Sequence, residues 1–99
     1  MNYFISYDIK KNRYRSRTAK VLLKYGAVRV QKSVFFIFEA APFYIKELKE
    51  KITVILEEAD DTDSVLLIKV EKDWLNKVSI IGENEAYKDS MKIYHTKFF

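Results

Sequence analysis

The chain has 99 residues, 48% of them hydrophobic and 15% aromatic, which allows one domain with a substantial core and excludes a disordered chain. Cysteine is absent, which excludes disulfides, thiolate catalysis and zinc sites built on sulfur, and suits a cytosolic protein. The net charge of +4 is unevenly spread along the chain. Residues 1–35 hold nine Lys or Arg and one acidic residue, whereas residues 36–99 hold nine Lys or Arg and thirteen acidic residues. The first third is therefore expected to bind a polyanion such as nucleic acid.

The first half of the chain predicts a strand, a helix and two further strands. Residues 2–7 are rich in aromatic and β-branched residues, and Asp8 should end that strand. A helix is expected from an N-cap at Asn12 to Gly26 at the C′ position, with one apolar face made of Tyr14, Thr18, Val21, Leu22 and Tyr25. The same spacing predicts a neighbouring basic stripe of Arg13, Arg17, Lys20 and Lys24. Strands near 27–31 and 33–39 follow.

The second half predicts a helix and two strands. Pro42 is placed to open the helix, whose apolar stripe is expected to be Ile45, Leu48, Ile52, Ile55 and Leu56. The run "EEADDTDS" lacks the glycine and the final glutamate of a calcium loop, so it is interpreted as a solvated loop. Strands near 64–70 and 77–81 complete an α+β, ferredoxin-like βαββαβ order with an additional C-terminal strand.

Both faces of the predicted sheet are apolar. In "SVFFIFE", Val34, Phe36 and Phe38 point to one face and Phe35 and Ile37 to the other, and "SVLLI" repeats this alternation. Two helices can cover only one face of a four-stranded sheet, and monomers seldom expose a large apolar patch. We therefore expect a homodimer in which two copies pack sheet to sheet.

Several segments resemble the CRISPR-associated protein 2 family: "SYDI" on the first strand, a helix ending in "KYGA", then "RVQKSVF", "DSVLLIKV" and "WLNKVSIIG". The resemblance spans roughly residues 2–82, which predicts a ferredoxin-like domain over 1–82 and a C-terminal extension over 83–99. It implies a homodimer in CRISPR adaptation that binds double-stranded DNA beside the adaptation integrase. It also implies a magnesium-dependent endonuclease on RNA or DNA in some members, so enzymatic activity stays open.

The resemblance carries site residues with it. Asp8 matches the family aspartate that is assigned to the metal, and Tyr7 precedes it as in many members. Ser33 and Phe35 match the "QxSVF" motif, and these four residues form the predicted catalytic set. Arg15, Arg17 and Arg29 match functional arginines of other members. The turn "KKN" is basic where many members have acids.

The chemistry of magnesium explains why Asp8 would need a second copy. Mg²⁺ prefers octahedral oxygen coordination, keeps several waters and often takes only one or two carboxylates plus phosphate. One Asp8 makes a poor site, whereas two Asp8 side chains across a dimer axis could share one ion. The alternative is an Asp8 carboxylate satisfied by backbone donors in the turn.

Duplex binding is assigned to six basic residues, namely Arg13, Arg15, Arg17, Lys20, Arg29 and Lys32.

Two other functions remain open. One is a stand-alone, toxin-like, metal-dependent ribonuclease. The other is a single-stranded RNA-binding module, because "YFISYD" and "KSVFFIF" loosely resemble aromatic RNA-binding strands.

Trp74 is expected to pack over the sheet edge, and His95, the only histidine, to be solvated. No apolar run approaches the ~20 residues that span a membrane and no signal-peptide pattern is present, so we expect a cytoplasmic protein without a membrane partner.

Overall fold

A computed structural model describes residues 1–82 of the chain. Its elements are β1 (Asn2–Asp8), α1 (Asn12–Lys24), β2 (Val28–Gln31), β3 (Val34–Ile37), α2 (Pro42–Glu58), β4 (Ser64–Val70) and a 3₁₀ helix (Trp74–Lys77). The predicted extension over 83–99, with His95, lies outside the described residues. Among the described helices none is long and apolar enough to cross a membrane.

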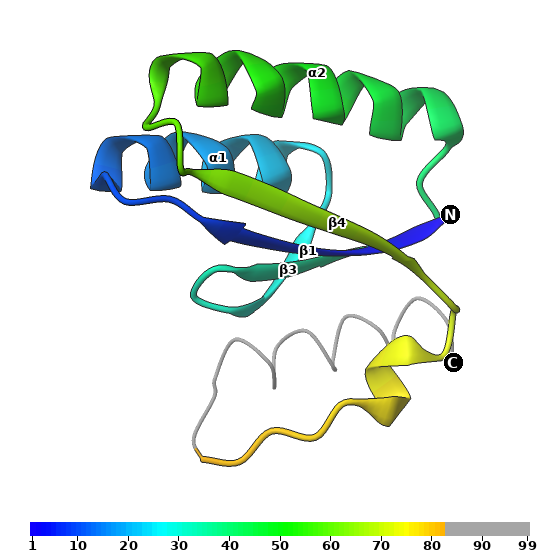
Figure 1. Cartoon of the computed structure of the whole chain (residues 1–99). Coiled ribbons are helices and arrows are strands. Elements are labelled where there is room, and N and C mark those ends of the chain that lie inside the picture. The colour runs from blue at the N-terminus through cyan, green and yellow to red at the C-terminus, as the bar shows by residue number, and fades with distance from the viewer. Residues whose placement is uncertain (83–99) are drawn as a thin grey trace.

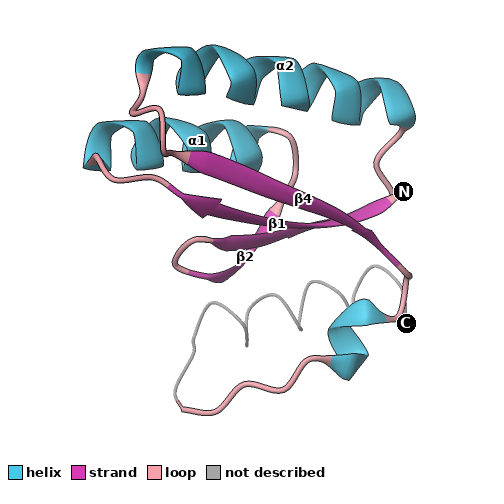
Figure 2. Ribbon diagram, viewed as in Figure 1, coloured by secondary structure: helices cyan, strands magenta, loops and turns pink. Residues whose placement is uncertain are grey.

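The four strands form one antiparallel sheet in the order β2-β3-β1-β4. Strand β1 pairs with β4 along its whole length, from Asn2 opposite Val70 to Asp8 opposite Ser64. Both long helices lie on one side of the sheet, and the 3₁₀ helix lies on the other (Figure 1, Figure 2). The predicted α+β, ferredoxin-like βαββαβ order is therefore confirmed.

The ends of α1 follow from local backbone chemistry. The helix begins at Asn12 and its N-cap is Lys11, so the predicted N-cap was one residue late. Gly26 adopts a φ of 85° just past the helix, a conformation that glycine reaches without steric cost. The N–H of Gly26 donates to the Leu23 carbonyl and that of Ala27 to the Leu22 carbonyl, each at 3.0 Å. These two bonds complete a Schellman motif, which ends the helix sharply before β2.

The core lies between the helices and one face of the sheet. Ile5 from β1 and Phe35 from β3 are fully buried there, together with Leu22 and Leu48 from the two helices. The alternation predicted for β3 is confirmed, because Phe35 and Ile37 face the helices whereas Phe36 packs on the other side. The predicted stripes of both helices are also buried or half-buried in this core.

The opposite face of the sheet is partly covered by the chain itself. The Trp74 ring stacks on Phe36 of β3 at 5.2 Å between centroids and lies 5.0 Å from Phe4 of β1. Val78 packs against the same cluster. The strand predicted near 77–81 is not formed within the part of the chain that the structure describes, where no residue of that segment pairs with another strand. Apolar contact with the sheet face competes with strand addition at its edge, and here it wins. Trp74 packs as predicted, but over the inner strands instead of the edge.

Trp74→Ala is expected to lower the free energy of unfolding by about 2 kcal/mol, less than the ~3–5 kcal/mol of a fully buried aromatic because the side chain is half-buried. Denaturant unfolding followed by circular dichroism measures this. Phe43→Ala on α2 is the control, since Phe43 is 69% exposed and its removal should change stability by less than ~0.5 kcal/mol. Equal midpoints for both variants would show that the Trp74 contact adds no stability.

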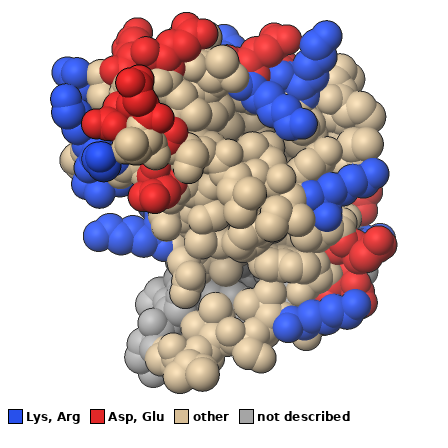
Figure 3. Space-filling view, viewed as in Figure 1, with Lys and Arg blue, Asp and Glu red and all other residues tan. Residues whose placement is uncertain are grey.

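A smaller apolar area remains uncovered on β4. Leu66 and Ile68 are 54% and 44% exposed on the face opposite the helices. Figure 3 shows a broad surface without charged side chains across the middle of the molecule. Because Trp74 already covers part of the sheet, the apolar area available to a second copy is smaller than the sequence indicated.

Candidate functional site

A hollow of about 560 Å³ opens between the outer side of α1, the end of β1 and the β2–β3 hairpin. It gathers residues from four separate segments of the chain. Its walls are formed by Tyr7, Asp8, Ile9, Asn12, Arg15, Ser16, Ala19, Lys20, Leu23, Arg29, Lys32 and Ser33. Seven of the ten residues predicted for the site are among them, so part of the predicted catalytic set lies beside part of the predicted nucleic-acid-binding set.

The charge of the hollow is strongly positive. Arg15 and Lys20 reach it from α1, Arg29 from β2 and Lys32 from the hairpin turn. Asp8 is the only acidic residue in its walls. Four cations around one carboxylate favour a polyanion at this surface, because low-dielectric walls focus the field of like charges that line one concavity.

Helix geometry places these groups. Asn12, Ser16 and Lys20 follow one another at four-residue spacing, so they lie on one side of α1 and share that side with Arg15 and Ala19. The short side chains of Ser16 and Ala19 leave space between the two long cations. Asn12 and Ser16 were missed in the sequence prediction, although their spacing from Lys20 was a signal for them.

The hairpin is held against β1 by Tyr7. Its hydroxyl donates to the Lys32 carbonyl at 3.2 Å, and its backbone N–H donates to the Ser33 carbonyl at 3.1 Å. The guanidinium carbon of Arg29 lies 4.9 Å from the centre of the Phe35 ring. Phe35 is fully buried, so it supports Arg29 from behind and does not line the hollow. Ser33 does line it.

Two of the predicted nucleic-acid-binding residues lie elsewhere. Arg13 donates to the Tyr14 hydroxyl at 2.7 Å, and Arg17 forms a 2.8 Å ion pair with Glu58 of α2. Neither contributes to the walls of the hollow. The single basic stripe expected on this helix is therefore divided, with Lys20 in the hollow and Arg17 directed to α2.

Asp8 is exposed, and its carboxylate makes no hydrogen bond or ion pair within the described residues. The turn satisfies Asp63 instead, whose Oδ1 accepts the Lys10 backbone N–H at 3.1 Å. Within residues 1–82 no group of three or more His, Cys, Asp or Glu is close enough to hold a metal ion. Asp8 fits a Mg²⁺ site only as one carboxylate among waters and phosphate, or as half of a site completed by another molecule.

Fold and site together define the class: a ferredoxin-like α+β protein with a cationic hollow around one exposed carboxylate. The sequence model described as CRISPR associated protein Cas2 matches residues 1–78. The chain therefore belongs to the Cas2 family.

Individual relatives agree with this assignment. The "CRISPR-associated endoribonuclease Cas2 1" of Chloroflexus aurantiacus is 31% identical over 95% of this chain and 98% of its own length. The "CRISPR-associated endoribonuclease Cas2 2" of Pyrobaculum aerophilum is 27% identical over 95% of this chain and 100% of its own. The crystal structure of Streptococcus pyogenes Cas2 at pH 6.5 superposes with a TM-score of 0.71 at 27% identity, covering 83% of this chain and 100% of that one.

Proposed function

We propose that the chain acts in CRISPR adaptation as a cytoplasmic homodimer that holds duplex DNA for the adaptation integrase. The observation that carries this proposal is the hollow, in which four cations from α1, β2 and the hairpin face one solvent-accessible surface. Such a surface contacts phosphates and reads the shape of a duplex, not its bases. Duplex affinity measured against salt concentration tests this function, because phosphate contacts give a steep and sequence-independent salt dependence.

The single-stranded RNA-binding alternative is disfavoured by the sheet face. Such modules stack bases on exposed aromatic rings of the two central strands. Here Phe36 on β3 is fully buried, and the Trp74 ring lies against both Phe36 and Phe4 of β1. The rings that would stack on bases are therefore occupied by contacts within the chain.

The homodimer is supported by two features of one face. Leu66 and Ile68 leave apolar surface in water, and Asp8, on the same face of the sheet, offers a carboxylate that a second copy could pair for a shared Mg²⁺. An isologous two-fold contact is the commonest way for one patch to meet its own copy.

We expect light scattering to give twice the 11.8 kDa chain mass at micromolar concentration, and Leu66→Lys with Ile68→Lys to return it to the single-chain value. A lysine ammonium at a packed apolar contact must be dehydrated without a partner, which is costly. Val54→Lys on α2 is the matched control, since Val54 and Leu66 are each 54% exposed. A dimer that survives the β4 substitutions would place the interface on another surface.

A second candidate is a magnesium-dependent endonuclease, either within adaptation or as a stand-alone ribonuclease. It is favoured by the exposed Asp8 carboxylate without a partner in the described chain, and by the relatives that are named endoribonucleases. Bound Mg²⁺ would supply Lewis-acid polarisation of a phosphodiester and a more acidic bound water.

The chain's own side chains have separable roles in that reaction. Asp8 would bind the ion, and Arg15 and Lys20 would hold the phosphate in the hollow. The Tyr7 hydroxyl is engaged with the Lys32 carbonyl, so it positions the hairpin and with it Ser33. No histidine or glutamate is among the described walls of the hollow, so a slow reaction is expected if it occurs.

A further inference from the structure

The unpaired state of Asp8 needs an explanation, because cations surround it. Lys10 and Lys11 follow it in the chain, and Arg15 shares the hollow with it. A lysine ammonium on its flexible four-carbon stem readily approaches a carboxylate two residues away. Yet the Asp8 carboxylate makes no ion pair within the described residues, so something keeps these ammonium groups elsewhere.

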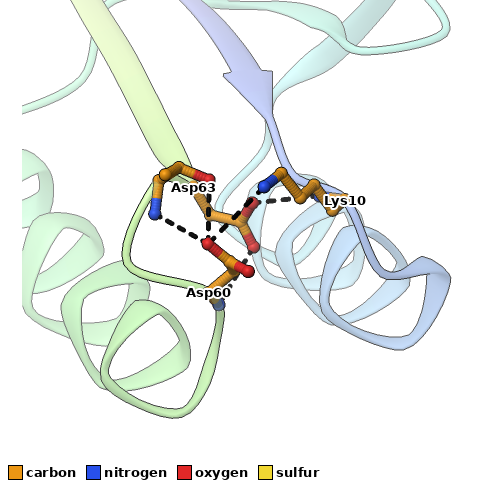
Figure 4. Close-up of polar contacts among 4 residues, drawn as sticks. Lys10, Asp60 and Asp63 are labelled. Atoms are coloured by element: carbon orange, nitrogen blue, oxygen red, sulfur yellow. Dashed lines mark hydrogen bonds and ion pairs between the residues drawn. The ribbon is translucent and has the colours of Figure 1, made fainter.

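For Lys10 the structure shows what holds it. Its Nζ lies 3.7 Å from Oδ1 of Asp60, and its backbone N–H donates to Oδ1 of Asp63 at 3.1 Å (Figure 4). Both carboxylates belong to the α2–β4 loop, which is distant in sequence from β1. Because Asp8 and Ser64 are opposite each other in the β1–β4 register, this loop lies at the same end of the sheet as Asp8.

The loop is built to present these carboxylates. Oδ1 of Asp60 accepts the Thr62 backbone N–H at 2.9 Å and the Thr62 hydroxyl at 2.8 Å. Oδ2 of Asp63 accepts the Asp60 backbone N–H at 3.3 Å. The hydrogen bonds from Thr62, with the Lys10 ammonium nearby, lower the pKa of the Asp60 carboxyl. Within the run interpreted from sequence as a solvated loop, residues 59–63 form a largely exposed but ordered turn that is bound to the segment after Asp8.

We infer that Asp60 and Asp63 are positioning residues for the Asp8 site: they hold Lys10 and its backbone on the α2–β4 loop and so leave the Asp8 carboxylate open. This deepens the proposed metal site and rests on it for its purpose. It also bears on how the basic "KKN" turn is compatible with cation binding, since the Lys10 ammonium, the cation nearest to Asp8 in the chain, forms an ion pair with Asp60.

Access to the Asp8 carboxylate can be measured without metal. Carbodiimide coupling to glycine ethyl ester, followed by trypsin and mass spectrometry, reports Asp8 alone, because residues 1–10 contain no other acidic side chain. Asp60→Ala is expected to slow Asp8 labelling roughly two- to five-fold, the size of effect that a surface ion pair can exert. Adding Lys10→Ala should restore the original rate, and the peptide 1–11 then still contains Asp8 alone.

The matched control is Asp61→Ala, which removes the same charge from the same loop but makes no contact with Lys10 among the described residues. It should leave labelling unchanged. If Asp60 only stabilised the fold, its removal would loosen the turn and speed Asp8 labelling, and Lys10→Ala would not reverse the change. Unchanged or faster labelling in Asp60→Ala therefore overturns the inference.

Binding of Mn²⁺ as a probe for Mg²⁺ separates this inference from the proposed function. Two- to five-fold weaker Mn²⁺ binding in Asp60→Ala, rescued by Lys10→Ala, supports both. If Asp8 labelling slows in Asp60→Ala and recovers with Lys10→Ala, but the parent binds no Mn²⁺, the positioning role is supported and the metal site is overturned. If Asp60→Ala changes neither Mn²⁺ binding nor Asp8 labelling, the metal site is supported and the positioning role is overturned.

Discussion

Arg15→Ala with Lys20→Ala is expected to weaken duplex DNA binding about a hundred-fold in moderate salt. These side chains extend from one side of α1 into the hollow. The proposed dimer would double them to four. Four exposed ion pairs, each worth up to about 1 kcal/mol, account for a loss of this size. The slope of log affinity against log salt should fall by roughly four, since each phosphate contact contributes roughly one.

Fluorescence anisotropy with two unrelated duplexes, each at several salt concentrations, makes the measurement. Lys46→Ala with Lys49→Ala is the matched control, because it removes the same charge from exposed positions of α2. Arg13→Ala with Arg17→Ala tests how far the binding surface extends beyond the hollow. If the hollow variant binds as tightly as the parent with an unchanged slope, the hollow does not hold DNA.

Asp8→Asn is expected to reduce magnesium-dependent cleavage of RNA or DNA by roughly a hundred-fold or more, because the ion contributes several kcal/mol to such a transition state. The amide keeps the shape of the carboxylate but loses its charge. Duplex binding without Mg²⁺ should be retained or strengthened, because the hollow loses its only negative charge.

The controls distinguish catalysis at Asp8 from a non-catalytic, DNA-holding role. Asp61→Asn makes the same chemical change at an exposed position of the α2–β4 loop and should cleave like the parent. Cleavage that persists in Asp8→Asn would assign it to a contaminant or to another site. If neither the parent nor Asp8→Asn cleaves while both bind duplex DNA, the chain acts as a non-catalytic scaffold.

The fold was predictable because apolar residues recur at regular strand and helix spacings in the sequence. Alternation in β3 separated Phe35 from Phe36, and both helices carried unbroken apolar stripes. The grouping of Asp8 with Arg15 in the hollow was predictable, because α1 directly follows the end of β1 and so keeps these residues close together.

Other features depend on contacts between distant segments. No local pattern states that Trp74 would stack on Phe36, and the segment after it was therefore predicted as a strand. Likewise Arg13 and Arg17 share a helix with Lys20, but the pairing of Arg17 with Glu58 is decided by the position of α2. The role of Asp63 was hidden for the same reason, because its partner Lys10 is 53 residues away.

The sharp end of α1 also limits how this family member can change in length. Only Tyr25, Gly26 and Ala27 connect the helix to β2, and the Schellman bonds fix two of them. Successive strand residues face opposite sides of a sheet, so one inserted or deleted residue here would turn Arg29 away from the hollow and Val30 out of its apolar cluster. Insertions should therefore be rare in this connection, and a peptide tag or a circular-permutation break would be better placed elsewhere.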